Sequence, residues 1–119
     1  AVCPDLALIC QPYSEISDIA QKSGINVIHE AFIDRNYQAN GALINRINRD
    51  AIVSSIEDQV RQALKIVLKG KVMTKNSKHI QIKADTLCIH GDNPDSVSIA
   101  IETKKILQEN GCQIIGYEF

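Results

Sequence analysis

The chain has 119 residues, of which 45% are hydrophobic and 23% are charged, as in an ordinary globular domain. Its 13 Lys and Arg residues are interspersed with 14 Asp and Glu residues, so the formal net charge is −1. Nucleic-acid binding needs clustered basic residues, and this charge pattern therefore excludes a nucleic-acid partner. No run approaches the roughly 18 apolar residues of a membrane span, which predicts no membrane partner.

The four cysteines show no C-x-x-C spacing and predict a reduced, cytoplasmic protein. Cys10, Cys88 and Cys112 lie inside or beside apolar runs, where a free cysteine behaves as a small hydrophobic residue. The length predicts a single domain or half-domain over residues 1–119. Because the sequence opens on Ala-Val-Cys without a methionine, we expect it to start partway through a longer protein.

The first βαβ unit is predicted over residues 6–33. Leu6–Cys10 is a continuous apolar run, as in a parallel strand buried on both faces, and Ile25–Ile28 is a second, shorter strand. Between them a helix begins after Ser14 and ends at Gly24, with a right-handed crossover expected. The residues that would face inward from this helix are Ile16, Ile19 and Ala20.

The next segment, Asp34 to about Asp50, is predicted to be a long loop rich in asparagine. Tyr37, Leu43 and Ile44 are expected to anchor it to the body of the protein. A loop of this length is usually either functional or disordered, and the anchors favour a functional loop.

The clearest helix is predicted to begin at the capping box Ser54-x-x-Glu57 and to end at Gly70, with an ion pair between Glu57 and Arg61. Short strands are then expected at Val72–Thr74 and Lys78–Ala84. The apolar positions that recur at helical spacing in this helix are Ile56, Val60, Ala63, Leu64 and Val67.

The last βαβ unit is predicted to comprise a buried strand at Thr86–His90, a helix, and a final strand at Cys112–Ile115. The helix is expected to begin with Asn93 as its cap and Pro94 at its first position, and to end at Asn110-Gly111. Its predicted inward-facing residues are Val97, Ala100, Ile101 and Leu107.

These elements predict an α/β fold with parallel strands and crossover helices. In such folds side chains beyond the carboxyl ends of the strands converge on one edge and form the site. We therefore expect Gln11, Glu30 and His90 to lie near the same edge of one sheet.

His90 is a candidate catalytic residue because it ends an apolar strand and is followed by Gly91 and Asp92. The glycine permits close approach of a ligand, and Asp92 is an acid able to orient the imidazole. The alternative is a core histidine bonded to a neighbouring carbonyl. His29 and His79 lack such a setting and are expected to be structural or exposed.

Glu30, Asp34 and Arg35 form a second candidate group. The carboxylates of Glu30 and Asp34 can act as bases or ligands, and the Arg35 guanidinium can hold a substrate carboxylate through two hydrogen bonds. The alternative is a local salt bridge between Asp34 and Arg35. Tyr37 is either a hydroxyl donor to the substrate or a loop anchor, and Arg46 is either a second anion contact or a solvated residue.

Three segments together resemble the LamB/YcsF family, whose members are also called the A subunit of 5-oxoprolinase. They are Glu30-Ala-Phe-Ile-Asp-Arg-Asn-Tyr37, Asn40-Gly-Ala-Leu-Ile-Asn-Arg46 and Cys88-Ile-His-Gly-Asp-Asn-Pro94. The similarity runs from about Leu6 to Ile115, and family members are about twice this long. The chain therefore resembles their carboxyl-terminal half.

The resemblance implies an irregular (β/α) barrel of the glycoside hydrolase/deacetylase type, of which this chain would form about half. It also implies ATP-dependent opening of 5-oxoproline, or a related lactam, to L-glutamate together with other 5-oxoprolinase subunits. ATP and Mg²⁺ are the implied cofactors. The sequence shows no phosphate-cradling Gly-rich loop, no H-E-x-x-H and no nucleophile elbow, and predicts no metal site of its own.

The implied partners are the missing amino-terminal half or a second copy of the chain, because half a barrel leaves unpaired strand edges. We therefore expect this chain alone to be inactive. Two other functions stay open. One is a non-catalytic half-domain that binds a small anion or a partner, and the other is a metal-dependent amide hydrolase or deacetylase.

The chain departs from the family pattern at two positions. Asn40 stands where an Asp before the Gly is usual, and Asn45 stands where a Pro before the Arg is usual. Because an amide cannot act as a base, no role that needs a charged group is expected at Asn40.

Overall fold

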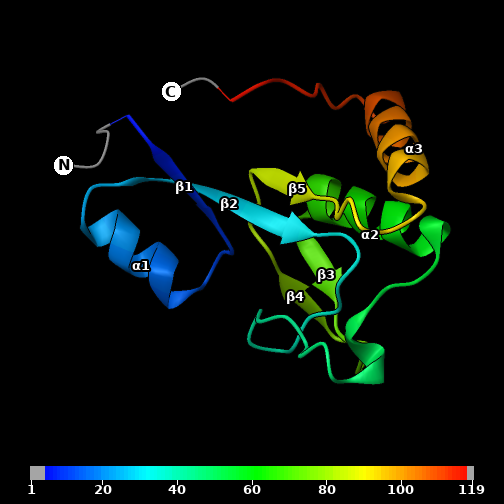
Figure 1. Ribbon diagram of the computed structural model, residues 1–119, viewed down its shortest axis with the longest axis horizontal. Helices are drawn as coiled ribbons and strands as arrows, with labels where there is room; N and C mark the ends of the chain where they lie inside the picture. Colours follow the sequence, from blue (N-terminus) through cyan, green and yellow to red (C-terminus); the bar gives the residue numbers. More distant parts are fainter. Residues whose placement is uncertain (1–4, 118–119) are drawn as a thin grey trace.

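The structure is a computed structural model that describes residues 5–117, so Cys3 lies outside the described residues. Helices and strands follow one another in the order that the apolar pattern predicts as far as α3 (Figure 1). The elements are β1 (Ala7–Cys10), α1 (Glu15–Lys22), β2 (Asn26–Phe32), the 3-10 helix η1 (Arg49–Ala51), α2 (Ile56–Lys69), β3 (Lys71–Met73), β4 (His79–Gln81), β5 (Thr86–Cys88) and α3 (Ser96–Glu109).

The main sheet contains three strands in the order β1-β2-β5, and all of them are parallel. This confirms the α/β fold with parallel strands. The described strands form an open sheet, and none of the described helices has the length and apolar character needed to cross a membrane.

The strands are staggered along the sheet. β1 pairs with the first part of β2, where Cys10 lies beside His29, so Gln11 is level with Glu30 as predicted. β5 pairs with the last part of β2, and its first residue, Thr86, lies beside Glu30. β1 and β2 therefore begin at the same level, and β5 begins four residues further along the common strand direction.

This stagger moves His90 away from Glu30. Cys88 pairs with Phe32, so His90, two residues further on, is level with Asp34. Four residues of parallel strand span about 13 Å, so the prediction that His90 and Glu30 share an edge is wrong. Asp34 is the acidic residue at the level of His90.

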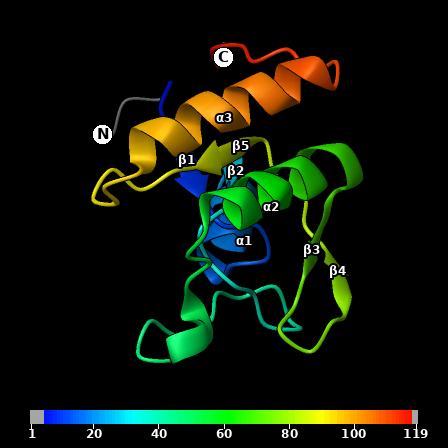
Figure 2. The ribbon, with the colours of Figure 1, turned by 90° about the vertical axis from the view of Figure 1, so that its right-hand side faces the viewer.

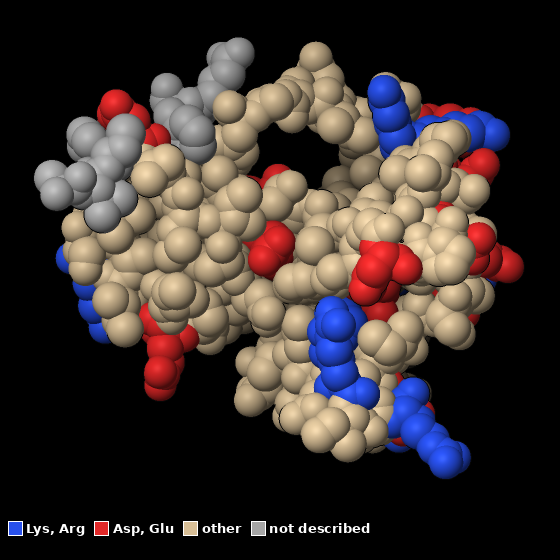
Figure 3. Space-filling model, viewed as in Figure 1, with Lys and Arg blue, Asp and Glu red and all other residues tan. Residues whose placement is uncertain are grey.

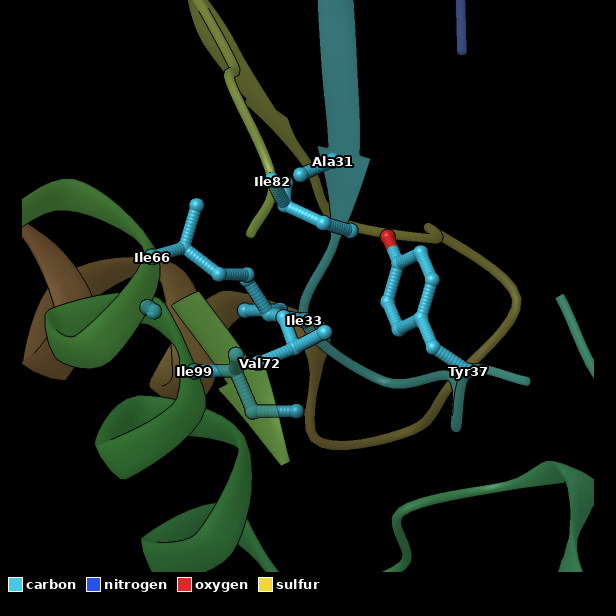
Figure 4. Packing of buried hydrophobic residues seen from close by; sticks show 8 residues of the cluster. Ala31, Ile33, Tyr37, Ile66, Val72, Ile82 and Ile99 are labelled. Carbon is cyan, nitrogen blue, oxygen red and sulfur yellow. The ribbon is translucent and has the colours of Figure 1, made fainter. Parts of the chain in front are cut away.

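The two faces of β2 have different surroundings because side chains alternate along a strand. Ala31 and Ile33 are fully buried, and they form a core with Ala63 and Ile66 of α2 and Ile99 of α3 (Figure 4). Figure 2 shows α2 and α3 side by side. The residues that alternate with Ala31 and Ile33 in the sequence therefore face away from this core.

Helix α1 begins as predicted, because the Ser14 hydroxyl accepts a hydrogen bond from the backbone N–H of Ser17 at 3.3 Å. Its buried residues are Ser17 and Ala20, whereas Ile16 and Ile19 are 53% and 64% exposed. The prediction that both isoleucines face inward is therefore wrong. The Ser17 side of the helix turns to the sheet because its hydroxyl hydrogen-bonds to β2.

Helix α2 is capped one residue later than predicted. The Ser55 hydroxyl, not that of Ser54, accepts the Asp58 backbone N–H at 3.0 Å, and it donates to the Asp58 carboxylate at 2.7 Å. The predicted ion pair is confirmed, since Arg61 contacts Glu57 at 2.6 Å. The shift arises because two adjacent serines offer equivalent caps, and both are followed three residues later by an acid.

The hairpin β3–β4 forms a second, antiparallel sheet. Gly70 ends α2 in the left-handed conformation, with φ of 58°, and the chain turns directly into β3. Val72 and Ile82 bury the hairpin against the core. The predicted strand at 78–84 is regular only at its centre, because β3 is short and pairs with three residues of β4.

Helix α3 begins at Ser96 rather than directly after the predicted cap. Asn93 accepts the backbone N–H of Asp95 at 2.9 Å through its side chain, and this turn precedes the helix. The preference of asparagine for such turns competes with its capping role.

The buried face of α3 consists of Ile99, Thr103 and Leu107. Val97 and Ile101 are 70% and 60% exposed, and Ala100 is exposed too, so only Leu107 of the four predicted residues faces the core. Apolar residues lie on several sides of this helix, so the position of α2, not the sequence period, decides which side is buried.

The predicted last strand, Cys112–Ile115, is not formed. The segment is irregular and pairs with no described strand. In Figure 1 it leaves α3 and runs past β5 rather than along it.

We expect Ser55→Ala to lower the free energy of unfolding by about 1 kcal/mol, because the mutation removes the side-chain cap of α2. Urea denaturation of the purified chain measures this change. The matched control is Ser54→Ala, which should leave stability almost unchanged. The opposite ranking of the two variants would contradict the cap seen in the structure.

Candidate active site

Asp34 and His90, two of the candidate residues, contact each other directly. His90 Nδ1 lies 2.6 Å from Asp34 Oδ2, and the two side chains are 25% and 14% exposed. Because a carboxylate only accepts hydrogen bonds, the Nδ1–H donates to it. The Nε2 atom of the neutral ring then carries the free lone pair, as a general base requires.

The strand register brings this pair together. Asp34 and His90 each follow the last ladder pair of β2 and β5, Phe32 with Cys88, by two residues, so both side chains point to the same face. The Phe32 ring stacks on the imidazole with centroids 5.4 Å apart and an interplanar angle of 18°. The ring of His90 is therefore held by a hydrogen bond at one edge and an aromatic ring on one face.

The second carboxylate oxygen of Asp34, Oδ1, is buried and has no hydrogen-bond partner among the described residues. A buried acceptor without a partner costs about 1–3 kcal/mol, and such atoms usually point to a missing donor. A hydrogen-bond donor or cation from a ligand, or from another part of the protein, fits this position.

Glu30 and Cys88 extend the same face of the sheet. Burial raises the pKa of the Cys88 thiol above its ordinary value, and the carboxylates of Glu30 and Asp34 raise this pKa further. The thiol therefore stays protonated and donates a hydrogen bond to Glu30. Cys88 is a poor nucleophile in this setting, and Glu30 is the second acidic group of the face.

Tyr37 anchors the loop rather than facing a substrate. It is 2% exposed, and its hydroxyl accepts the backbone N–H of Phe32 at 2.8 Å. Burial raises the pKa of Tyr37 to about 12, and the neighbouring carboxylates of Asp34 and Glu30 add to this effect. The burial of Tyr37 in the core and the packing of Leu43 against that core confirm that these two residues anchor the loop to the body of the protein.

Arg35 is used to hold the same loop. Its side chain is 6% exposed, with Nη2 donating to the carbonyl of Ile44 at 2.7 Å and Nε donating to that of Ala51 at 3.4 Å. The alternative salt bridge with Asp34 is not formed, and the hold on a substrate carboxylate stays a prediction. Two of the three guanidinium nitrogens of Arg35 thus donate hydrogen bonds to loop carbonyls.

Gln62 of α2 is a structural residue that the sequence reasoning missed. Its side-chain amide donates to three carbonyls, those of Phe32, Ile33 and Arg35, at 3.0, 3.2 and 2.8 Å. Gln59 similarly donates to a loop carbonyl and is 1% exposed. The sequence signal for these hydrogen bonds was the presence of two glutamines on the inner side of the amphipathic helix α2.

Asp92 and Arg46 lie on the surface. Both are exposed, and neither makes a hydrogen bond or ion pair in the described part of the chain. The predicted orienting acid for His90 is therefore replaced by Asp34, because the strand register places Asp34 level with the ring. Arg46 matches the solvated alternative, and no described atom approaches the Cβ position of Gly91.

The two positions that depart from the family pattern both form local turns. Asn40 and Asn45 accept the backbone N–H groups of Ala42 and Ile47, each at 3.0 Å. An aspartate at position 40 would offer the same acceptor oxygen, so the turn does not require the amide.

The other histidines behave as predicted. His29 is half-buried, with Nε2 2.8 Å from the Ser17 hydroxyl, and it supports the packing of α1 on the sheet. His79 is exposed.

No three His, Cys, Asp or Glu side chains of residues 5–117 come together as a metal-binding group. A cleft of about 410 Å³ lies between α2, the hairpin and η1, and its cations are Arg61, Lys65 and Lys75. Arg61 is paired with Asp58 and Lys75 with Asp50, which leaves Lys65 as the lining cation without an ion pair among the described residues.

The comparisons with known proteins all indicate the same family. The model of the LamB/YcsF family matches residues 1–118. A protein from Pyrococcus horikoshii, named as the A subunit of 5-oxoprolinase, is 35% identical over 93% of this chain and 44% of its own length. A protein of the same name from Staphylococcus haemolyticus is 37% identical over 80% of this chain and 38% of its own length.

The fold is shared with a solved structure. The crystal structure of a lactam utilization protein from Thermus thermophilus matches with a TM-score of 0.88 and 32% identity. The match covers 96% of this chain and 45% of that chain. The chain thus spans less than half of the length of these relatives.

We expect Tyr37→Phe to lower the free energy of unfolding by about 1–3 kcal/mol, because the buried N–H of Phe32 loses its acceptor. Thermal or urea denaturation measures the change. Tyr13→Phe is the matched control, since Tyr13 is 61% exposed and should tolerate the same loss of a hydroxyl.

Ionisation of Tyr37 should also make the stability of the protein depend on pH in the alkaline range. An unfolded tyrosine ionises near pH 10, whereas the pKa in the folded state is about 12, so ionisation favours the unfolded state between these values. The stability contribution is present below about pH 10 and falls as the pH rises toward about 12. The part of this loss of stability that comes from Tyr37 should be absent in the Tyr37→Phe variant. Identical pH profiles for the two proteins would contradict the assignment.

Arg35→Ala is expected to destabilise the loop and lower the melting temperature, because the half-buried Ile44 carbonyl loses its side-chain donor and the Ala51 carbonyl keeps only the Asn36 N–H. Differential scanning calorimetry, together with limited proteolysis of the loop, measures this effect. Arg46→Ala, which changes an exposed arginine in the same loop, is the control and should behave like the unmodified chain. Unchanged stability of the Arg35→Ala variant would contradict the structural role of Arg35 and favour the predicted role in substrate binding.

Proposed function

The chain belongs to the LamB/YcsF family, and from this membership and the Asp34–His90 pair we propose that it forms part of an enzyme that opens 5-oxoproline to L-glutamate. The reaction would be ATP-dependent and would require further subunits. The family membership supports the substrate class, and the Asp34–His90 pair is the single observation that supports a catalytic role.

The names of the relatives support this proposal at the level of substrate and assembly. Proteins named as the A subunit of 5-oxoprolinase match 80–93% of the chain, and the name describes one component of a larger complex. The solved relative is named as a lactam utilization protein, and 5-oxoproline is a lactam.

In the proposed reaction His90 moves the protons. Nε2 takes a proton from the water that attacks the lactam carbonyl, a new C–O bond forms, and the ring C–N bond then breaks as the proton passes to the leaving nitrogen. Asp34 holds the ring through Nδ1 and stabilises the imidazolium that exists between these two transfers. The stacked ring of Phe32 restricts rotation of the imidazole.

Glu30 is the proposed second acidic group, because it lies on the same face of β2 as Asp34, four residues earlier. Arg35 and Tyr37 contribute by holding the loop that carries Asp34 at its start.

ATP and Mg²⁺ belong to the proposed reaction of the complete enzyme, where the nucleotide would activate the lactam carbonyl. The described residues do not fit a nucleotide site, because the sequence has no phosphate-cradling loop and, of the cleft cations Arg61, Lys65 and Lys75, only Lys65 is not paired with a described carboxylate. We therefore assign no nucleotide contact to this chain.

We further propose that the open sheet is part of an irregular (β/α) barrel of the glycoside hydrolase/deacetylase type, with this chain as its carboxyl-terminal half. Helices on one side of staggered parallel strands support such a barrel. The free thiols Cys10, Cys88 and Cys112 support a cytoplasmic location.

His90→Ala in the complete, assembled enzyme should lower kcat by about 10²- to 10⁴-fold, since general acid–base catalysis contributes this much. Asp34→Asn should also lower kcat, because an amide can turn its donor toward Nδ1 and stabilise the wrong tautomer. Release of glutamate from 5-oxoproline is the measurement.

His79→Ala is the matched control, because His79 is exposed and distant in sequence from the pair. Folding of each variant is checked by its melting temperature. Full turnover in His90→Ala with an unchanged melting temperature would remove the catalytic proposal and leave a non-catalytic binding module as the function of the chain.

The 119-residue chain alone should show no 5-oxoproline-dependent ATP hydrolysis, because its sheet is open and Asp34 Oδ1 lacks a partner among the described residues. The assay compares this chain with a complete relative under the same conditions. Activity of the monomeric chain would show that no further half is needed.

A further inference from the structure

The sequence contains two Asn-Gly pairs, Asn40-Gly41 and Asn110-Gly111. Asparagine is a thermolabile residue because its side-chain amide can be attacked by the backbone nitrogen of the next residue. A following glycine makes this attack easiest, since it has no Cβ to hinder its own nitrogen. The two pairs have the same local chemistry, so the folded structure decides which of them reacts first.

Asn40 lies at the tip of a small hairpin in the loop after β2. The Gln38 N–H donates to the Ala42 carbonyl at 2.8 Å, the Gly41 N–H donates to the Gln38 carbonyl at 3.0 Å, and residues 38–40 are exposed. In Figure 1 this loop runs along the bottom of the molecule, and in the same view of Figure 3 the region is a lobe that projects from the body. Water therefore reaches the Asn40 side chain.

The Asn40 side chain is folded toward the backbone that follows it. Its Oδ1 accepts the backbone N–H of Ala42 at 3.0 Å, two residues further on. This hydrogen bond holds the side-chain carbonyl beside the Gly41 peptide and polarises it, so Cγ becomes a better electrophile. Asn110 is arranged differently, because its Nδ2 donates to the Ile106 carbonyl at 2.8 Å and the side chain points back along α3.

The same turn at other positions lacks the glycine. The side chains of Asn45, Asn48 and Asn93 also accept the backbone N–H two residues further on. An arginine follows the first two and hinders the attack with its side chain, whereas a proline, whose nitrogen carries no hydrogen, follows the third. Within residues 5–117 the forward-folded side chain and the following glycine thus coincide only at Asn40.

We propose that Asn40 is a site of spontaneous deamidation. The Gly41 nitrogen loses its proton to solvent and attacks Asn40 Cγ, a new N–C bond closes a succinimide ring, and the Cγ–Nδ2 bond breaks. The departing nitrogen takes up a proton and leaves as ammonia. Water then opens the ring at either carbonyl and gives aspartate or isoaspartate. The inference goes beyond the proposed function and does not depend on it.

The two products have different effects on the loop. Aspartate keeps an acceptor for the Ala42 N–H and carries the charge of the residue that is usual at this position in the family. Isoaspartate adds a methylene to the main chain before Gly41, which is buried, has φ of 85°, and has its Cβ position 3.1 Å from the Tyr13 ring. The longer main chain displaces this glycine where little space is free, so isoaspartate loosens the hairpin.

The test is incubation of the purified chain in mildly alkaline buffer for several days, followed by peptide mapping with mass spectrometry. We expect the peptide with Asn40 to change from amide to acid at least threefold faster than the peptide with Asn110. Isoaspartate is identified by its enzymatic methylation. In urea, where the fold is lost, the two rates should become similar.

Three variants serve as controls. Asn40→Gln keeps a side-chain amide but needs a larger ring for the same attack, so its peptide should stay unchanged. Asn110→Gln should leave the rate at Asn40 unaltered. Asn40→Asp carries the charge without the added methylene. It should resist proteolysis of the loop like the fresh chain, whereas the aged chain should be cut faster.

Faster reaction at Asn110 than at Asn40 in the folded chain would overturn the inference. So would a ratio of the two rates that stays the same in urea, or a change from amide to acid at position 40 of the Asn40→Gln variant. Turnover of 5-oxoproline enters none of these measurements, so the inference and the proposed function can fail separately.

Discussion

Side chains alternate along β2, and this alternation sets both the core and the candidate site. Ala31 and Ile33 enter the core with α2 and α3, so Phe32 and Asp34 must point to the other face. A shift of one residue would bury Asp34 and expose Ile33, at a cost the core cannot offset. The packing of the helices therefore also determines that Asp34 faces His90.

The loop after β2 is held by buried polar groups rather than by a salt bridge. Arg35, Tyr37 and Gln62 satisfy backbone groups of the loop and of the strand end. Hydrogen bonds of buried groups are costly to lose, so these three side chains give an irregular segment a defined shape. The conspicuous residues Arg35 and Tyr37 thus stabilise the setting of the Asp34–His90 pair, and the pair itself remains the chemical feature of this face.

Apolar surface is common at both ends of the sheet. Ile16 and Ile19 of α1 are exposed beside the β1 edge, and Val97 and Ile101 of α3 are exposed at the other end. Large exposed apolar patches and open strand edges usually mark sites of association. The relatives contain more than twice the matched length, which agrees with a sheet that continues on both sides.

Local sequence patterns were enough to predict the order and type of most elements, and the resemblance of three segments was enough to predict the family. Apolar periodicity, caps and glycine positions act within a few residues, so they can be read without the fold. The same patterns could not show which side of α1 and α3 is buried, which acid contacts His90, or that residues 112–115 stay unpaired in the described structure. Those outcomes follow from strand stagger and from packing against elements far away in the chain, so they became visible only in the folded molecule.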